Sequence, residues 1–258
     1  MEYKAKKSFG QNFLINKGIQ KKIIEGAEIH NEVTLEIGPG LGALTYLMIP
    51  HVKELYAYEL DKELYDRFIL ENHPQNIHFI NKDFLLENFE NFNDNEIVVV
   101  GNIPYNITSD ILFNLLKYSN KIKRATLMMQ KEVCLRLLAK PNTKEYGKLT
   151  VSMNIFANIS KVVEAKAREF NPAPKVDSMV VRIDFIKANN WLEANKKQVL
   201  DFILRCFQFK RKTLYNNLIT KYSKEQILQA FETLNIPNNI RAEALEKEVF
   251  IELFKALK

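Results

Sequence analysis

The segment VTLEIGPGLG, residues 33–42, decides the fold class. Its first five residues are typical of a buried β-strand, and the glycines that follow form a loop leading into a helix-like segment at residues 41–49. Such glycines let the backbone approach a ligand closely beside the free N–H groups of a helix N-terminus. The spacing departs from the dinucleotide fingerprint G-x-G-x-x-G, because Gly42 comes one residue early and Pro39 separates the first two glycines. Gly38 and Gly40 are therefore candidate ligand contacts.

Strands and helices alternate after this segment. The β-rich runs lie at residues 55–60, 77–80, 97–100 and 125–129, with helix-like stretches such as 62–70 between them. This order predicts a parallel, doubly wound Rossmann-like sheet. The run IVVV at 97–100 is apolar at every position, which is typical of a central strand covered on both faces.

The pattern changes towards the C-terminus. Two further strands are expected at residues 149–157 and 178–186, and only helical periodicity follows the segment 187–190. The expected helices cover residues 192–207, 212–222, 224–234 and 242–257. We therefore predict an α/β domain at residues 1–186 and a small all-helical domain at residues 187–258.

Two acidic residues end the second and third strands. Glu59 follows the glycine loop by about 20 residues, where a carboxylate accepts hydrogen bonds from both hydroxyls of a ribose. Asp83 could accept from an adenine amino group while Phe84 packs on the ring. Since ligands of open α/β sheets bind at the carboxyl edge, a nucleoside site is expected, with NAD and S-adenosylmethionine as candidates.

The sequence GNIPY, residues 101–105, follows the fourth strand and indicates the chemistry. The lone pair of an adenine N6 is delocalised into the ring, so the amine is a poor nucleophile. Accepting both N6 hydrogens, with Asn102 Oδ1 and the Pro104 carbonyl, would aim that lone pair at a methyl group. Tyr105 would stack on a base flipped out of its helix or loop. In-line methyl transfer then needs positioning, with no metal and no nucleophilic side chain.

Composition excludes several classes of protein. The 258 residues carry a net charge of +6, and 47% are hydrophobic, so a disordered chain is excluded. No apolar run is long enough to span a bilayer, and the N-terminal residues lack a secretory signal. Two isolated cysteines without metal-ligand spacing favour a reducing, cytoplasmic location and no metal site. Residues 1–184 hold 24 Lys/Arg and 23 Asp/Glu, whereas the remainder holds 13 and 8, so the basic excess lies in the tail.

The chain resembles the KsgA/RsmA family of small-subunit rRNA adenine dimethyltransferases over most of its length. The segments that carry the resemblance are 6–14 (KKSFGQNFL), 36–42 (EIGPGLG), 58–61 (YELD), 101–105 (GNIPY), 130–133 (QKEV), 146–149 (YGKL), 170–178 (FNPAPKVDS) and 207–214 (FQFKRKTL).

The resemblance implies transfer of four methyl groups from S-adenosylmethionine to two adjacent adenines in a hairpin near the 3′ end of 16S rRNA. The expected substrate is a pre-assembled 30S particle, and the enzyme is expected to be a monomer that binds no membrane. The implied cofactor contacts are Asn12, Leu14, Gly38, Glu59, Asp83 and Asn102. The target-amine site would comprise Asn102, Pro104 and Tyr105, with Phe170 as a second stacking ring.

The resemblance also implies an RNA surface in the basic tail. Lys210, Arg211 and Lys212 are expected to contact phosphates from one helix face, with the rings of Phe207 and Phe209 in the core. On composition alone, a solvated basic face is the more common arrangement.

Three alternatives stay open at this point. Erm enzymes, which methylate large-subunit rRNA, share the N-x-P-Y motif, although the segments KSFGQNFL and FNPAPKVDS favour the first family. A non-catalytic RNA-binding or transcription factor on this scaffold is disfavoured by the intact glycine loop and the intact GNIPY segment. An NAD-dependent dehydrogenase is disfavoured by the displaced third glycine.

Overall fold

A computed structural model describes residues 3–94, 96–187 and 189–258 of the chain. The chain folds into two compact units, one of residues 1–134 and 158–186, the other of residues 135–157 and 187–258. One boundary between the units follows Ile186, and residues 135–157, which we expected in the first domain, belong to the second unit. Ala188, within the expected linker, lies outside the described residues.

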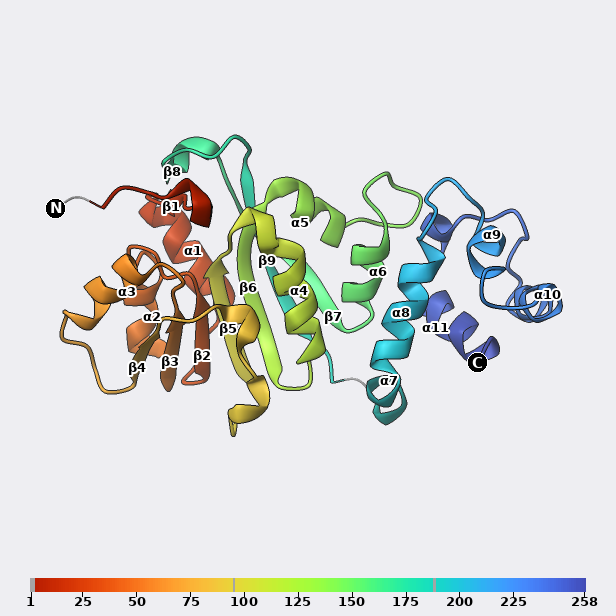
Figure 1. The fold of residues 1–258 in the computed structure, drawn as a ribbon, viewed down its shortest axis with the longest axis horizontal. Helices are drawn as coiled ribbons and strands as arrows, with labels where there is room; N and C mark the ends of the chain where they lie inside the picture. Colours follow the sequence, from red (N-terminus) through yellow and green to blue (C-terminus); the bar gives the residue numbers. More distant parts are fainter. Residues whose placement is uncertain (1–2, 95, 188) are drawn as a thin grey trace. The chain divides into compact units, whose positions relative to one another are not determined.

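The first unit contains a seven-stranded sheet in the order β4-β3-β2-β5-β6-β9-β7 (Figure 1). Neighbours from β4 to β6 pair in parallel, and β9 is antiparallel to β6. The strands are β2 (Val33–Ile37), β3 (Glu54–Tyr58), β4 (Ile77–Ile80), β5 (Ile97–Asn102), β6 (Ile122–Gln130), β7 (Ala157–Ala165) and β9 (Ser178–Phe185). The chain order reverses between β2 and β5, and ligands bind open sheets at such a switch point.

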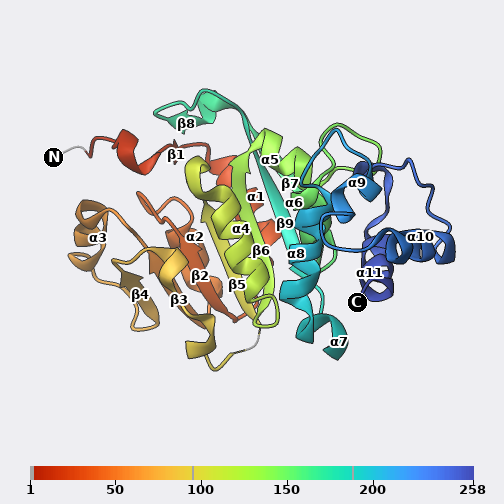
Figure 2. The same cartoon turned by 45° about the vertical axis from the view of Figure 1, so that its right-hand side comes forward.

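Helices cover both faces of this sheet. In Figures 1 and 2, α4 (Thr108–Lys117) lies in front of the strands and α1 (Lys17–Ala27) behind them. The remaining helices of this unit are α2 (Thr45–Met48) and α3 (Lys62–Ile69), and α5 (Lys131–Leu137) crosses its boundary. All four residues of the run at 97–100 have no exposed surface, so the predicted central strand is confirmed.

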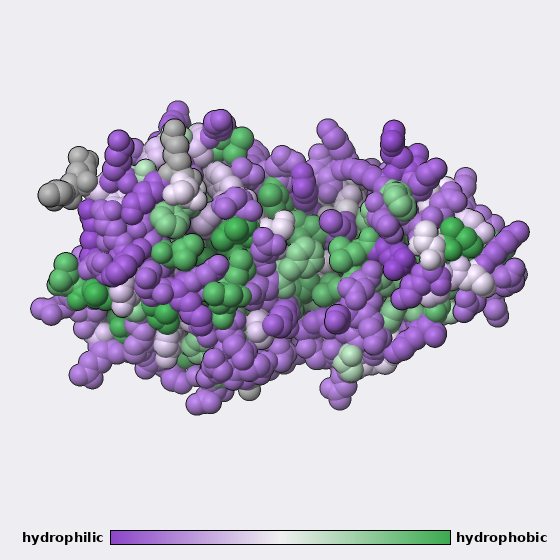
Figure 3. All heavy atoms as spheres, viewed as in Figure 1, coloured by the Kyte–Doolittle hydropathy of each residue, from purple (hydrophilic) through white to green (hydrophobic). Residues whose placement is uncertain are grey.

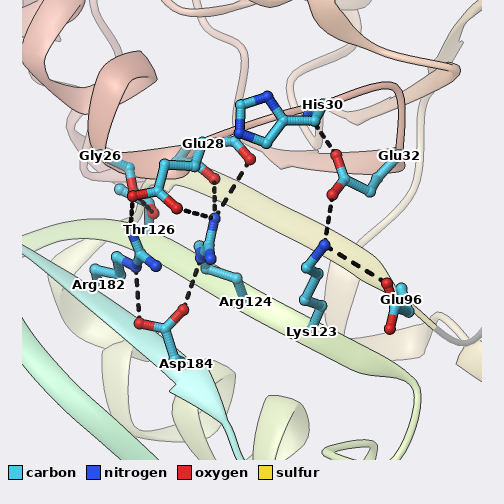
Figure 4. A network of polar contacts seen from close by, with 11 residues as sticks. Gly26, Glu28, His30, Glu32, Glu96, Lys123, Arg124, Thr126, Arg182 and Asp184 are labelled. Atoms are coloured by element: carbon cyan, nitrogen blue, oxygen red, sulfur yellow. Dashed lines mark hydrogen bonds and ion pairs between the residues drawn. The ribbon is translucent and has the colours of Figure 1, made fainter.

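An ion network fastens the end of α1 to β6 and β9 (Figure 4). The Arg124 guanidinium donates to the Ala27 carbonyl at 3.1 Å and to Asp184 Oδ1 at 2.7 Å. It also pairs with Glu28 at 3.1 Å, and Arg182 pairs with both Glu28 and Asp184. Because the Arg124 side chain is only 9% exposed, these partners compensate for removing its charge from water.

The second unit is helical. Its helices are α6 (Lys148–Asn154), α7 (Asn190–Ala194), α8 (Lys196–Cys206), α9 (Leu214–Leu218), α10 (Lys224–Thr233) and α11 (Lys247–Ala256). The strand predicted at residues 149–157 is wrong, because α6 occupies most of it and packs against α8. Leu149, Val151 and Met153 alternate with polar residues as a strand would, but packing against a neighbouring helix decides the structure here.

On the face drawn in Figure 3, hydrophilic side chains predominate and hydrophobic ones form smaller patches. Among the described residues, no helix is both long and apolar enough to cross a membrane. Cys134 and Cys206 are free and buried.

Candidate functional site

A cavity opens in the first unit at the carboxyl ends of β2, β3, β4 and β5. A two-stranded sheet of β1 (Phe13–Leu14) and β8 (Phe170–Asn171) holds the N-terminal arm, residues 3–15, beside it. All seven predicted cofactor residues line this cavity: Asn12, Leu14, Gly38, Gly40, Glu59, Asp83 and Asn102. The strand ends therefore meet as the sequence predicted.

The glycine loop and the end of β3 are joined through Glu59. Gly40 N donates to Glu59 Oε2 at 3.1 Å, and Asp61 N donates to Oε1 at 2.9 Å. Gly40 has φ +60°, and a Cβ there would lie 3.0 Å from the ring of Phe13. Burial raises the pKa of Glu59, which is 7% exposed, and the two N–H donors act against that rise. Each carboxylate oxygen keeps lone-pair capacity for a ligand hydroxyl.

Asp83 and Phe84 form the wall at the end of β4. Asp83 Oδ1 accepts from Leu85 N at 2.9 Å, which fixes the carboxylate at the start of a short 3₁₀ turn. Phe84 is buried edge-to-face on Tyr58 and lines the cavity. An acceptor beside an aromatic ring suits a purine with an exocyclic amine.

Asn102 is oriented by the N-terminal arm. Its Nδ2 donates to the Asn12 carbonyl at 2.9 Å, so Oδ1 keeps its acceptor capacity. The preceding residue has to be glycine, because a Cβ at Gly101 would lie 2.9 Å from the Ile37 carbonyl oxygen.

The carbonyl groups after Asn102 differ from the prediction. The Pro104 carbonyl accepts from Thr108 Oγ1 at 3.2 Å and from Ile107 N at 3.4 Å within the turn that begins α4. The Ile103 carbonyl, by contrast, accepts none of the loop hydrogen bonds found in the part of the chain that the structure describes. Ile103 therefore offers the freer backbone acceptor beside Asn102.

Tyr105 and Phe170 have different placements. Tyr105 lines the cavity, and its hydroxyl hydrogen-bonds the buried Ser178 Oγ at 2.7 Å, an anchor that the sequence did not reveal. Phe170 does not line the cavity: it is 3% exposed and packs in the core beside Leu14, which it pairs with across β1 and β8. This arrangement does not support the stacking role predicted for Phe170.

Glu36 is a cavity residue that the sequence reasoning missed. It is 1% exposed, and burial raises its pKa to about 8. Among the described residues, none hydrogen-bonds its Oε2. The signal was present in the sequence, since an acid inside an apolar strand directly before a glycine loop has no structural reason to be there.

The lining is rich in acceptors. Glu59 and Asp83 supply carboxylates, and Glu36 supplies a buried carboxyl group. Lys82, a lysine of the lining, pairs with Glu87 at 2.8 Å. Such a set fits S-adenosylmethionine, which presents hydroxyls, amines and a sulfonium cation, and would repel the diphosphate of NAD. The described residues contain no cluster of side chains that could hold a metal ion.

The basic residues of the tail lie in a turn between α8 and α9, not on a helix face as predicted. Lys210, Arg211 and Lys212 are exposed. Buried Asn217 holds this turn, accepting from Phe209 N at 2.8 Å and donating to its carbonyl at 3.3 Å. The Phe209 side chain is 48% exposed, so its predicted place in the core is also wrong, whereas Phe207 stacks on Phe250.

Comparisons with known proteins point to one family. Residues 2–258 match the family model described as ribosomal RNA adenine dimethylase. The chain is 50% identical to ribosomal RNA small subunit methyltransferase A of Metamycoplasma arthritidis (strain 158L3-1), with 100% of this chain and 98% of the relative covered. Its counterpart in Chlorobaculum parvum (strain DSM 263 / NCIMB 8327) is 43% identical, with coverage of 100% and 93%.

Solved structures agree. A dimethyladenosine transferase from Plasmodium falciparum superposes with a TM-score of 0.80 at 28% identity, covering 93% of this chain and 95% of that one. The 23S rRNA methyltransferase ErmE superposes with a TM-score of 0.73 at 29% identity, covering 95% and 99%.

Proposed function

The chain belongs to the ribosomal RNA adenine dimethylase family and is an S-adenosylmethionine-dependent enzyme, and from this premise we propose that its substrate is small-subunit rRNA. We propose that it transfers four methyl groups to two adjacent adenines in a hairpin near the 3′ end of 16S rRNA. Two relatives that are at least 43% identical are named as small-subunit enzymes, whereas ErmE is 29% identical, which supports the small-subunit substrate over the large-subunit one.

The cofactor is proposed to lie along the strand ends. Glu59 would accept from its ribose hydroxyls, and Asp83 would accept from its adenine amine beside Phe84. The unpartnered Oε2 of Glu36 offers a further hydrogen-bonding group for its amino-acid end. When bound, S-adenosylmethionine supplies an electrophilic methyl group on a sulfonium.

The target amine is proposed to sit at Asn102, and the orientation of this side chain is the observation that carries the mechanism. Because its Nδ2 is committed to the Asn12 carbonyl, Oδ1 accepts one N6 hydrogen. The Ile103 carbonyl accepts the other, in place of the Pro104 carbonyl. Pro104 fixes the backbone of this turn. Drawing both hydrogens out of the base plane leaves the nitrogen lone pair free to attack.

Tyr105 is proposed to hold the flipped base by stacking. The hydrogen bond to Ser178 holds the ring in place before the base binds. The side chain therefore loses less rotational entropy on binding. Burial raises the pKa of Tyr105, so the ring stays neutral at physiological pH. The side chains at this site thus position the amine and take no covalent part in the reaction.

RNA binding outside the pocket is proposed for the turn at residues 208–212 of the helical unit. Its three cations suit phosphate contacts, and they are displayed on a backbone that buried Asn217 holds in place. We further propose that the substrate is a pre-assembled 30S particle, that the enzyme acts as a monomer, and that it works in the cytoplasm where such particles form.

Tritiated methyl transfer tests the proposed function. Immature small subunits from a strain that lacks the activity should accept label, whereas naked rRNA and large subunits should accept much less. The variant Asn102→Ala should reduce incorporation by about 100-fold or more. Equal labelling by this variant, or preferential labelling of large subunits, would overturn the proposal.

A further inference from the structure

Three side chains of the N-terminal arm converge on one buried carboxylate. Asp61 is 1% exposed, and its Oδ1 accepts from Lys6 Nζ at 2.8 Å. Its Oδ2 accepts from Gln11 Nε2 at 3.1 Å and from the hydroxyl of Tyr3. The arm is tied together as well, because Lys6 N donates to Gln11 Oε1 at 2.7 Å. These donors come from residues that lie 50 to 58 positions before Asp61 in the sequence.

Asp61 is also part of the framework of the cavity. Its Oδ1 accepts from Glu63 N at 3.0 Å, which caps the N-terminus of α3. Its own N–H donates to Glu59 Oε1 at 2.9 Å. One residue therefore links the arm, a helix start and the carboxylate proposed to bind ribose.

The arm in turn forms a wall of the cavity. Gln11, Asn12, Phe13 and Leu14 line it. The Phe13 ring packs where a Cβ on Gly40 would be, and the Tyr3 ring lies edge-to-face on it at 5.8 Å. Because the anchored residues and the lining residues belong to one short segment, releasing the anchor removes a restraint on that wall.

We propose that Asp61 is a positioning residue that latches the N-terminal arm over the cofactor and thereby sets how long the cofactor stays bound. This inference rests on the proposed cofactor site. The latch consists of Asp61 with Tyr3, Lys6 and Gln11. Its members make no hydrogen bond to Asn102 or Tyr105 in the described structure, so the latch reaches the target-amine site only through the arm, whose Asn12 carbonyl orients Asn102.

Variants on the two sides of the latch test it separately. Tyr3→Phe and Lys6→Gln remove arm donors and leave the cap on α3 intact, while Asp61→Asn keeps the shape of the side chain and removes its charge. Lys62→Gln is the matched control, because Lys62 also pairs with an aspartate on α3, at 2.6 Å, without touching the arm. Stopped-flow and calorimetry would measure the dissociation rate and affinity of S-adenosylhomocysteine.

Each latch variant should release S-adenosylhomocysteine about tenfold faster than wild type, as loss of one charge-assisted hydrogen bond implies. At saturating cofactor the turnover number should fall by a smaller factor than the release rate rises, and Lys62→Gln should match the wild type in both quantities. A turnover number that falls without a change in cofactor release would contradict the latch, as would release rates equal to those of the control.

Trypsin cleavage after the exposed Lys4 gives a readout that needs neither cofactor nor RNA. In the latch variants, Lys4 should be cut faster while cleavage in the rest of the chain stays at the wild-type rate. Uniformly faster cleavage would mean general destabilisation, and unchanged cleavage would mean that Asp61 does not hold the arm; both outcomes refute the latch. A wild-type protein that bound no S-adenosylmethionine would instead refute the proposed function.

Discussion

Replacing Glu36 with glutamine should make the folded protein more stable at alkaline pH than the wild type. Glu36 is fully buried at the end of β2, and burial raises its pKa from 4.5 to about 8. A carboxyl group whose pKa is raised on folding binds more protons in the folded state, so its ionisation opposes folding. Stability from this residue is therefore greatest below pH 4.5 and is lost as the pH rises to about 8.

The size of the effect follows from the pKa. Each pH unit between the two pKa values lowers the free energy of unfolding by about 1.4 kcal/mol. Between pH 6 and pH 9, the wild type passes through about two such units, so ionisation of Glu36 should lower its free energy of unfolding by roughly 3 kcal/mol. Glutamine keeps the shape of the side chain and cannot ionise, so this component disappears in Glu36→Gln.

Denaturant unfolding at several pH values between 6 and 9, without cofactor, measures this difference. Other groups titrate equally in both proteins, so the gap between the two curves isolates Glu36. Glu25→Gln, at an exposed position on α1, is the control and should follow the wild type within about 0.5 kcal/mol. Parallel curves for Glu36→Gln and wild type would show that Glu36 is ionised in the folded protein and would refute the reasoning.

Three further predictions concern packing, the ion network and the basic turn. Alanine at Gly101 should lower the free energy of unfolding by about 2–3 kcal/mol, because its Cβ would lie 2.9 Å from the Ile37 carbonyl oxygen; an unchanged denaturation midpoint would contradict this. Methionine in place of Arg124 should lower the free energy of unfolding at pH 7 by about 2–3 kcal/mol, because it leaves the partners of the buried arginine without their counter-charge. Burial acts to raise the pKa of Asp184, but its arginine hydrogen bonds lower it overall, so this cost should shrink as the pH falls below 3.8; a pH-independent cost in urea unfolding would argue against the network. Alanine at residues 210–212 should weaken RNA binding and reduce the log–log salt slope by about 2, with cofactor affinity unchanged, as filter binding and calorimetry would measure; a fall in cofactor affinity would refute the division of roles between the units.

The parallel sheet could be predicted because its strands are β-rich runs that end in distinctive residues. Glycines after β2, Glu59 after β3, Asp83 after β4 and Asn102 at the end of β5 mark one edge of the sheet. Parallel pairing with matched registers brings these ends together, so position in the sequence was sufficient to predict that these residues line one cavity.

The features that were missed depend on contacts between distant segments. The sequence does not show that Ser178 reaches Tyr105, that the Phe170 ring faces the core, or that the turn around Phe209 is held by Asn217. Alternation of apolar residues at 149–157 fits a strand as well as a helix over a short stretch. A short pattern of this kind decides between a strand and a helix only when the elements that pack against it are known.

Mapping N6,N6-dimethyladenosine along rRNA from a strain that lacks this activity tests the central claim most directly. With the wild-type gene restored, two adjacent dimethylated adenines should appear near the 3′ end of small-subunit rRNA, and with Asn102→Ala they should be absent or scarce. Modification of large-subunit rRNA instead, or full modification by the Asn102→Ala variant, would contradict the account.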